Sequence, residues 1–354
     1  MMKNIAVIGA GANGLATAAW LTLQGHQVTL CDTADQLKET AAVQEGGIRV
    51  DGAFGAPENP IVPSLITDEI GKAVQQAEII LICVSAQRQE SIGRLVCPAL
   101  ENGQTVLFNP GNLGAVRFIR LRPELSAMPE LCLAELSGCL WACRVTESNQ
   151  VRVALPLSAK RLAAYPAAKT SVACQRAASL FPVLPATNVL EATLNSPNVI
   201  THLCGTIFNV AQIEQRGEEF AFFQHGMSES VVRAFVMLEK ERNQVLGAAG
   251  LQIYEESSEN FMRTLMDKGI APHLDLFRAL KGPSSMTHRY ITEDASCGVA
   301  LLISLAKWYQ VPVPLTESFL TIASALNGCD YAKQGATLEN LGLLSSLMTQ
   351  KHDH

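Results

Sequence analysis

The stretch Ile5-Ala6-Val7-Ile8-Gly9-Ala10-Gly11-Ala12-Asn13-Gly14 near the start of the chain decides the fold. Its first four residues form an apolar, β-branched run of the kind found in buried strands. A helical pattern follows over residues 15–23, with Gly25 as a stop signal, and a second strand is predicted over residues 27–32. The chain therefore opens with a strand–helix–strand unit.

Three glycines in this stretch have the spacing Gly-x-Gly-x-x-Gly, which alone is a weak signal because glycines also make ordinary turns. Here the strand before, the helix after and Asp32 at the end of the second strand supply the expected context. Such glycines let the backbone approach a pyrophosphate at the positive helix N-terminus, and Asp32 can accept bonds from ribose hydroxyls. We therefore expect dinucleotide binding by these residues: Gly9, Gly11, Asn13, Gly14 and Asp32.

Asp32 also bears on which dinucleotide binds, because a carboxylate there would repel a 2′-phosphate. Residues 33–35 contain no arginine to receive one. The sequence therefore favours NAD, with NADP as the less favoured alternative.

Further strands are predicted at residues 79–84, 105–108 and 131–134, at the intervals of a doubly wound sheet. Ligands bind at the carboxyl ends of parallel strands, so Val84, Asn109 and Gly111 are candidate neighbours of the cofactor. Turn chemistry explains Asn109-Pro110-Gly111-Asn112 equally well. Residues 151–155 alternate in polarity and are expected to extend this sheet.

The pattern changes to helices further along the chain. Helical spacing is found at residues 228–247, 301–308 and 317–326, and the charged run 239–242 suggests a solvated face or an internal ion-pair cluster. The predicted fold is α/β, with a doubly wound Rossmann domain over residues 1–190 followed by an all-α domain over residues 191–354.

Composition excludes several classes of function. Of 354 residues, 48% are hydrophobic and 17% charged, which suits large cores rather than disorder. The net charge of −6 and the lack of a basic cluster argue against nucleic-acid binding. No apolar run is long enough to cross a bilayer, and the start of the chain lacks signal-peptide architecture. We expect a soluble, cytoplasmic protein without a membrane partner.

The ten cysteines lie mostly in apolar runs and show neither C-x-x-C pairs nor zinc-ligand spacing. We expect free thiols and no metal site.

A nicotinamide reaction at a C=O or C=N bond needs a proton donor, and a histidine held by a carboxylate is a common solution. Among the internal histidines, His202 lies where the helical domain is predicted to begin. By itself, a histidine among isoleucine, threonine and leucine is more often structural.

Two motifs change that balance, namely Asn198-x-x-x-His202 and His288-Arg289-Tyr290-x-x-Glu293-Asp294. With them, the chain resembles the opine dehydrogenase family, which includes the octopine, nopaline and N-(1-carboxyethyl)-norvaline dehydrogenases. The resemblance covers nearly the whole chain and includes three further segments: Glu135…Arg144, Glu239-x-Glu241-Arg242 and Gly335-x-Thr337-Leu338-Glu339-x-Leu341-Gly342-Leu343. It implies that an amino acid is joined to a 2-oxo acid, often pyruvate, and that the imine is reduced with NAD(P)H.

Carried over by position, His202 matches the family's catalytic histidine and Asp294 its carboxylate partner. Arg144 and Arg289 are candidate clamps for substrate carboxylates, because a guanidinium binds a carboxylate bidentately. Asn198 lies one helical turn before His202 and could contact nicotinamide or substrate. Structural roles remain open for both arginines.

The sequence departs from the family at Leu203, where a proline is typical. This departure leaves open where the helix that carries His202 begins.

One alternative function is that of a ketopantoate or glycerol-3-phosphate reductase, but those enzymes use a lysine that the strand-end segments 85–88 and 109–112 lack. Another is a dinucleotide sensor without turnover. The amino acid is not specified by the sequence, and the apolar C-terminal helices leave a homodimer open.

Overall fold

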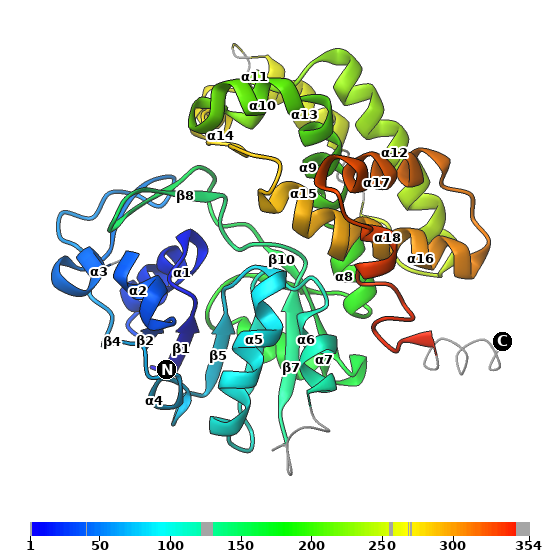
Figure 1. The fold of residues 1–354 in the computed structure, drawn as a ribbon. Helices are drawn as coiled ribbons and strands as arrows, with labels where there is room; N and C mark the ends of the chain where they lie inside the picture. Colours follow the sequence, from blue (N-terminus) through cyan, green and yellow to red (C-terminus); the bar gives the residue numbers. More distant parts are fainter. Residues whose placement is uncertain are drawn as a thin grey trace. The chain divides into compact units, whose positions relative to one another are not determined.

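The computed structural model describes residues 2–39, 41–121, 130–254, 258–267, 269 and 271–344. The described chain divides into two compact units, the first ending at Thr193 and the second beginning at Leu194. The first unit contains β-sheets with helices, and the second is helical (Figure 1). The predicted fold class, a Rossmann-type domain followed by a helical domain, is confirmed. Among the described residues, no helix has both the length and the hydropathy needed to span a membrane.

Within the described residues, the main sheet has eight strands in the order β11-β10-β7-β6-β5-β1-β2-β4. Within this order, the neighbouring strands β7, β6, β5, β1, β2 and β4 all run parallel, whereas β10 is antiparallel to β7. Their bounds are β1 (Asn4–Ile8), β2 (Gln27–Cys31), β4 (Leu65–Thr67), β5 (Ile79–Ile82), β6 (Thr105–Phe108), β7 (Cys132–Leu136), β10 (Lys160–Tyr165) and β11 (Val183–Pro185). The parallel order brings the carboxyl ends of β1, β2, β5 and β6 to one edge, where ligands bind in such sheets.

The alternating segment 151–155 does not extend this sheet, so that prediction is wrong. Its strand β9 (Gln150–Val153) belongs to a separate sheet with β3 (Arg49–Gly52) and β8 (Cys143–Glu147). The physical reason is burial. Strands inside the main sheet are covered on both faces, whereas β9 buries only Val151 and Val153, as its alternation requires.

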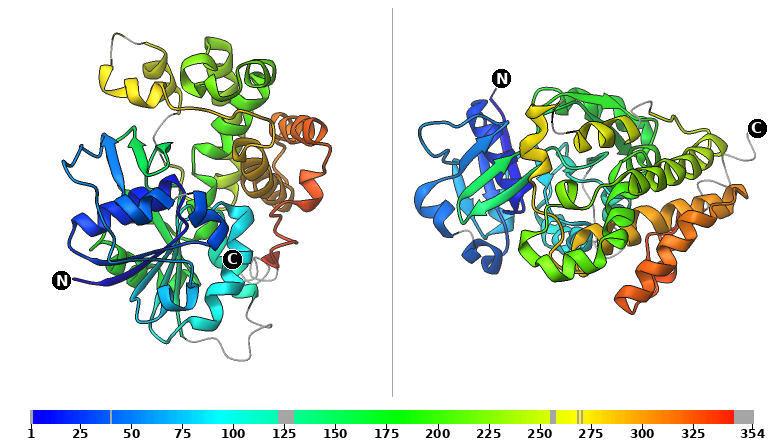
Figure 2. Two further views of the ribbon diagram at one scale, coloured as in Figure 1. Left: turned by 60° about the vertical axis from the view of Figure 1, so that its left-hand side comes forward. Right: turned by 90° about the horizontal axis from the view of Figure 1, so that it is seen from above.

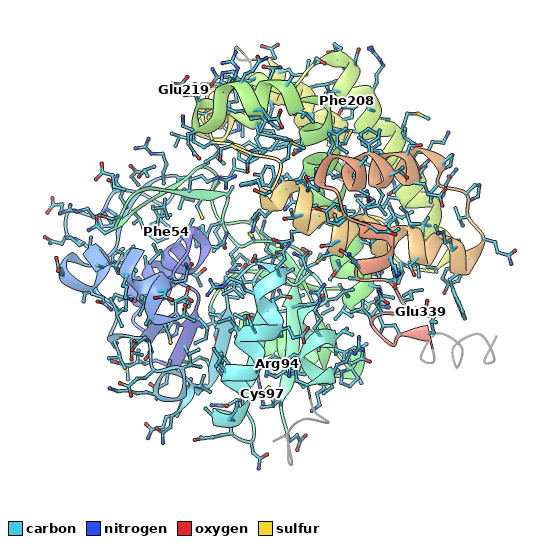
Figure 3. The ribbon with its side chains drawn as sticks, in the orientation of Figure 1. Phe54, Arg94, Cys97, Phe208, Glu219 and Glu339 are labelled. Carbon is cyan, nitrogen blue, oxygen red and sulfur yellow. The ribbon has the colours of Figure 1, made fainter. Side chains whose placement is uncertain are left out.

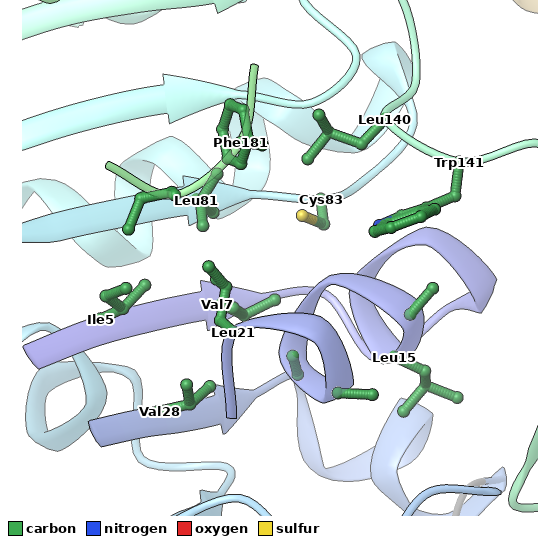
Figure 4. Close-up of a cluster of buried hydrophobic side chains, with 14 of the residues drawn as sticks. Ile5, Val7, Leu15, Leu21, Val28, Leu81, Cys83, Leu140, Trp141 and Phe181 are labelled. Carbon is green, nitrogen blue, oxygen red and sulfur yellow. The ribbon is translucent and has the colours of Figure 1, made fainter. Parts of the chain in front are cut away.

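Helices cover both faces of the main sheet (Figure 1 and Figure 2). One face packs against α1 (Ala12–Leu23) and α7 (Thr170–Ala177). Leu21 of α1 and Val7 of β1 belong to the buried cluster on this face (Figure 4). The other face packs against α4 (Ile70–Val74), α5 (Ala86–Val96) and α6 (Gly114–Arg120). Shorter elements are α2 (Ala34–Glu39), α3 (Ala41–Gly46), η1 (Cys97–Ala99), η3 (Ala167–Lys169) and α8 (Val189–Leu194).

The second unit is arranged around α9 (Asn198–Phe208), in which every residue from Val199 to Thr206 is buried. Around it pack α12 (Glu229–Ala248), α15 (Arg289–Glu293), the π-helix η6 (Asp294–Val299) and α17 (Pro314–Asn327). The other elements are α10 (Val210–Arg216), η4 (Gly217–Glu219), α11 (Phe222–His225), α13 (Ser258–Met266), η5 (Pro272–Leu274), α14 (Asp275–Arg278), α16 (Ala300–Tyr309) and α18 (Tyr331–Gln334). The helices predicted at 228–247, 301–308 and 317–326 are confirmed as α12, α16 and α17.

The charged run on α12 is an internal cluster rather than a solvated face. Arg242 is buried and pairs with Glu239 at 3.0 Å. The carboxylate of Glu241 accepts from the backbone N–H groups of Leu315 and Thr316, at 3.0 and 2.8 Å. These bonds satisfy the otherwise unpaired first turn of α17.

Candidate active site

The glycine loop between β1 and α1 has two glycines that the fold itself requires. Gly9 has φ +117°, and a Cβ on it would lie 2.5 Å from the carbonyl oxygen of Cys83 and 2.9 Å from the Val84 side chain. A Cβ on Gly14 would lie 1.7 Å from the carbonyl oxygen of Gly9. At Gly11, by contrast, an added Cβ would meet no atom within 4 Å. The loop is therefore open at Gly11, which fits close approach of a dinucleotide pyrophosphate to the backbone.

Asn13 and Asn109 bind each other and hold the segment after β7. Asn109 is fully buried, donates to Asn13 Oδ1 at 3.2 Å and accepts from the N–H of Leu140 at 2.9 Å. Asn13 in turn donates to the carbonyl oxygen of Trp141 at 2.9 Å. The two predicted cofactor residues thus link the glycine loop to the end of β6 through their side chains.

Gly111, in the loop after β6, packs directly against Glu135 on β7. A Cβ at position 111 would lie 2.7 Å from the Cβ of Glu135. The buried carboxyl of Glu135 accepts from the N–H groups of Leu113 and Ala115, both at 3.2 Å, and from the Thr193 hydroxyl at 3.0 Å. Burial raises the pKa of Glu135 to about 7. This acid therefore anchors the loop that carries the predicted cofactor contacts.

Asp32 has a partner that the sequence did not suggest. Its carboxylate, 1% exposed, accepts from the N–H groups of Ala10 and Thr33 and pairs with Arg88 Nη2 at 2.7 Å. Arg88 lies in the first turn of α5, 56 positions from Asp32 in sequence. The only signal in the sequence is its place shortly after β5, which lies in the sheet two strands from β2.

In the second unit, the structure brings His202 and Asp294 together from 92 positions apart. His202 Nδ1 lies 2.9 Å from Asp294 Oδ2, and both side chains are largely buried. Burial raises the pKa of Asp294 to about 8, while the positive charge of Arg289 acts in the opposite direction. Because both groups are largely removed from water, little solvent competes for the contact between the ring nitrogen and the carboxylate.

Two aromatic rings also hold His202, and neither was predicted to be a site residue. Tyr290 stacks on the imidazole with ring centroids 3.5 Å apart and planes 11° from parallel. The ring of Phe222 lies nearly perpendicular to both, at 88° to His202 and 85° to Tyr290. A Cβ on Gly205 would lie 2.4 Å from the Phe222 ring, so that glycine makes room for it. Tyr290 lies within the quoted motif, one turn before Asp294, which was the available signal.

The local backbone explains how Asp294 reaches His202. Asp294 is the first residue of η6, and π-turns are frequent at functional sites. A Cβ on Gly298 would lie 2.8 Å from Val199 Cγ2, so this glycine permits close packing of η6 on α9. The carbonyl of Ser296 accepts from the N–H of Ala336 at 2.7 Å. The C-terminal motif quoted above therefore braces the π-helix from its other side.

The remaining predicted substrate residues are placed in different ways. Asn198 is the first residue of α9 and Arg289 the first of α15, where its guanidinium lies 3.9 Å from Glu293. Arg144 belongs to the first unit, on β8, and donates to the carbonyl of Cys143 at 2.9 Å. The departure at Leu203 has no effect on helix start, because α9 runs unbroken from Asn198 to Phe208.

Comparison with known proteins gives matches to both parts of the chain. Residues 185–327 match the family "NAD/NADP octopine/nopaline dehydrogenase, alpha-helical domain", and residues 5–113 match the ketopantoate reductase family. An opine dehydrogenase of Arthrobacter sp. (strain 1C) is 33% identical over 350 residues, 96% of this chain and 95% of that protein.

Two solved structures show the same fold at low identity. Octopine dehydrogenase with NADH and pyruvate has a TM-score of 0.69 at 16% identity, covering 99% of this chain and 98% of that chain. Yersinopine dehydrogenase with bound NADP+ has a TM-score of 0.63 at 13% identity, covering 92% and 91%.

Proposed function

This chain belongs to the opine dehydrogenase family, and we propose that it joins the α-amine of an amino acid to a 2-oxo acid such as pyruvate, with NADH as reductant. The activity is that of an NAD(P)H-dependent oxidoreductase acting on CH–NH bonds. The observation that carries the assignment of residue roles is the buried His202–Asp294 pair, with 2.9 Å between ring nitrogen and carboxylate oxygen.

The roles proposed for the pair follow from its geometry. Bound NADH supplies the hydride for the reaction. Asp294 holds the proton of His202 at Nδ1, so Nε2 is the ring atom that exchanges a proton with substrate. His202 would thereby polarise the oxo group during condensation and protonate the nitrogen as the C=N bond is reduced. Burial strengthens both interactions because water does not compete for the carboxylate.

The substrates carry carboxylates, for which Arg289 and Arg144 are the proposed clamps. The role proposed for Arg289 is supported by its position. Arg289 lies with Tyr290 in the short helix α15, which ends at the residue before Asp294, and its charge acts on the Asp294 carboxyl. Asn198 is proposed as a further contact because it shares the face of α9 that carries His202. The helical domain, proposed to begin at residue 191, would provide the amino-acid side of the site.

For the cofactor, NAD(P)H binding is the family property, and we propose a preference for NADH. Asp32 supports this choice, since its buried carboxylate would oppose a 2′-phosphate at the end of β2.

The proposal is tested by following NADH oxidation with pyruvate against a panel of amino acids. Oxidation should require both partners. His202→Ala should lower turnover by about 10²- to 10⁴-fold, the usual contribution of a general acid, while NADH affinity stays nearly unchanged. His273→Ala, at an exposed histidine of the same unit, is the matched control and should retain full turnover.

Other outcomes would contradict the proposal in distinct ways. Oxidation with the oxo acid alone would indicate a keto-reductase, the class matched by residues 5–113. Full turnover by the His202→Ala variant would refute the assigned proton donor. NADH binding without oxidation under every pairing would indicate a dinucleotide sensor.

A further inference from the structure

The carboxylate of Asp32 is nearly saturated by the protein's own donors. Oδ1 accepts from Thr33 N–H at 2.8 Å and from Arg88 Nη2 at 2.7 Å, and Oδ2 accepts from Ala10 N–H at 2.8 Å. Each carboxylate oxygen offers two lone pairs, so only one position on Oδ2 remains for a ligand. Two ribose hydroxyls therefore cannot both bind Asp32 while Arg88 keeps its place.

The two partners differ in their freedom to adapt to a ligand. Asp32 is 1% exposed and is tied to two backbone N–H groups, so it cannot turn away. Arg88 is 34% exposed, and its second contact is a long 3.4 Å bond from Nη1 to Gln36 Oε1. Its long side chain can therefore exchange Asp32 for another anion at little steric cost, and a guanidinium matches phosphate geometry well.

We propose that Arg88 is a specificity-determining residue of the cofactor site. Its guanidinium competes with the adenosine ribose hydroxyls for Asp32 and provides the cation for a 2′-phosphate. This inference rests on the proposed dinucleotide function and names the residue that sets the choice of dinucleotide. Lacking arginine in residues 33–35, the chain supplies this cation from α5 instead. NADH remains preferred because Asp32 stays buried behind the guanidinium, whereas NADPH is tolerated.

The test measures binding of NADH and NADPH by their fluorescence, without any amino acid or oxo acid. Arg88→Gln should weaken NADPH binding about tenfold, the scale of one lost charge-assisted pair, and change NADH binding by less than about threefold. Asp32→Asn should strengthen NADPH binding, and the double variant Asp32→Asn/Arg88→Gln should lose that gain. Arg94→Gln is the matched control. Arg94, labelled in Figure 3, lies further along the same helix and pairs with exposed Glu90.

Two results would overturn the inference. One is an equal loss of NADH and NADPH affinity in Arg88→Gln, which would reduce Arg88 to a structural support of Asp32. The other is a gain in NADPH affinity from Asp32→Asn that persists in the double variant. If Asp32→Asn does not fold, the comparison of Arg88→Gln with Arg94→Gln decides the matter alone.

Failure of this inference is separable from failure of the proposed function. Binding that ignores Arg88, together with turnover that needs both substrates, refutes only the role of Arg88. Arg88-dependent binding without turnover under any pairing refutes only the proposed reaction.

Discussion

Tyr290 lies flat on the imidazole of His202, with ring centroids 3.5 Å apart and planes within 11° of parallel. The Phe222 ring lies nearly perpendicular to both, and Asp294 Oδ2 lies 2.9 Å from Nδ1. One face and one nitrogen of the imidazole are thus held by the protein. The protein therefore sets the plane of the ring, as the proposed role of His202 in proton transfer requires.

Tyr290→Leu should lower kcat by about 10- to 100-fold, because the imidazole loses the support that fixes its plane. Tyr290→Phe retains the aromatic face and should stay within about twofold of the wild type, since aromatic stacking does not need the hydroxyl. Steady-state kinetics with both substrates, alongside NADH affinity, measures the effect. A large loss in Tyr290→Phe would show that the hydroxyl, rather than the ring face, is what His202 needs.

Asp294→Asn should reduce kcat by about 10²- to 10⁴-fold while preserving the shape of the site. The amide can donate to Nδ1, which favours the opposite ring tautomer. The substitution also removes the carboxylate that would stabilise a protonated imidazole. Nitrogen NMR of the His202 ring reports the tautomer directly. An unchanged tautomer together with wild-type kcat would remove Asp294 from the mechanism.

Gly298→Ala should separate η6 from α9, because the new Cβ would lie 2.8 Å from Val199 Cγ2. We expect a loss of about 1–3 kcal/mol in unfolding free energy from overpacking. The His202–Asp294 contact should lengthen as well, with a fall in kcat. Denaturant unfolding and kinetics on the same preparation measure both effects.

Gly247→Ala provides the matched control for that substitution. Gly247 lies in α12, and an added Cβ there would meet no atom within 4 Å. Alanine should stabilise the helix by about 0.5–1 kcal/mol and leave kcat unchanged. If Gly298→Ala behaved like this control, close packing of η6 on α9 would not be what positions Asp294.

Glu135 should make stability depend on pH. Its pKa is raised from 4.5 to about 7 in the folded chain, so folding favours the protonated acid. The contribution of the protonated Glu135 to the free energy of unfolding is complete below pH 4.5 and is lost as the pH rises through about 7. At one pKa unit per 1.36 kcal/mol, the loss is on the order of 3 kcal/mol.

Glu135→Gln tests this by removing the ionisation. Its amide oxygen can replace Oε1 as the acceptor for Leu113 and Thr193, while its NH2 group faces the N–H of Ala115, a cost that does not change with pH. The Tm of the wild type should fall more steeply than that of the variant between about pH 5 and pH 8. Asp294 remains in both proteins, so its own raised pKa cancels in the comparison. Parallel Tm curves would mean that Glu135 ionises in the folded chain without a cost.

The fold of the first domain could be predicted from the sequence because the motifs that indicate it are local. Gly9, Gly11 and Gly14 stand directly between a predicted strand and a predicted helix, and Asp32 ends the next strand. The helix predictions also held, since α12, α16 and α17 repeat apolar residues at helical spacing. The alternating segment 151–155 was assigned to the wrong sheet, because alternation shows that one face is buried but not against which neighbour.

The sequence by itself therefore determined the element order and the glycine loop, and through family resemblance it predicted that His202 and Asp294 act together. Only the tertiary structure decided that Arg88 pairs with Asp32 and that Tyr290 and Phe222 hold His202. The physical reason is that these are contacts between elements. Strand order, a π-turn and glycine-permitted packing decide which side chains meet, and local sequence patterns do not encode those distances.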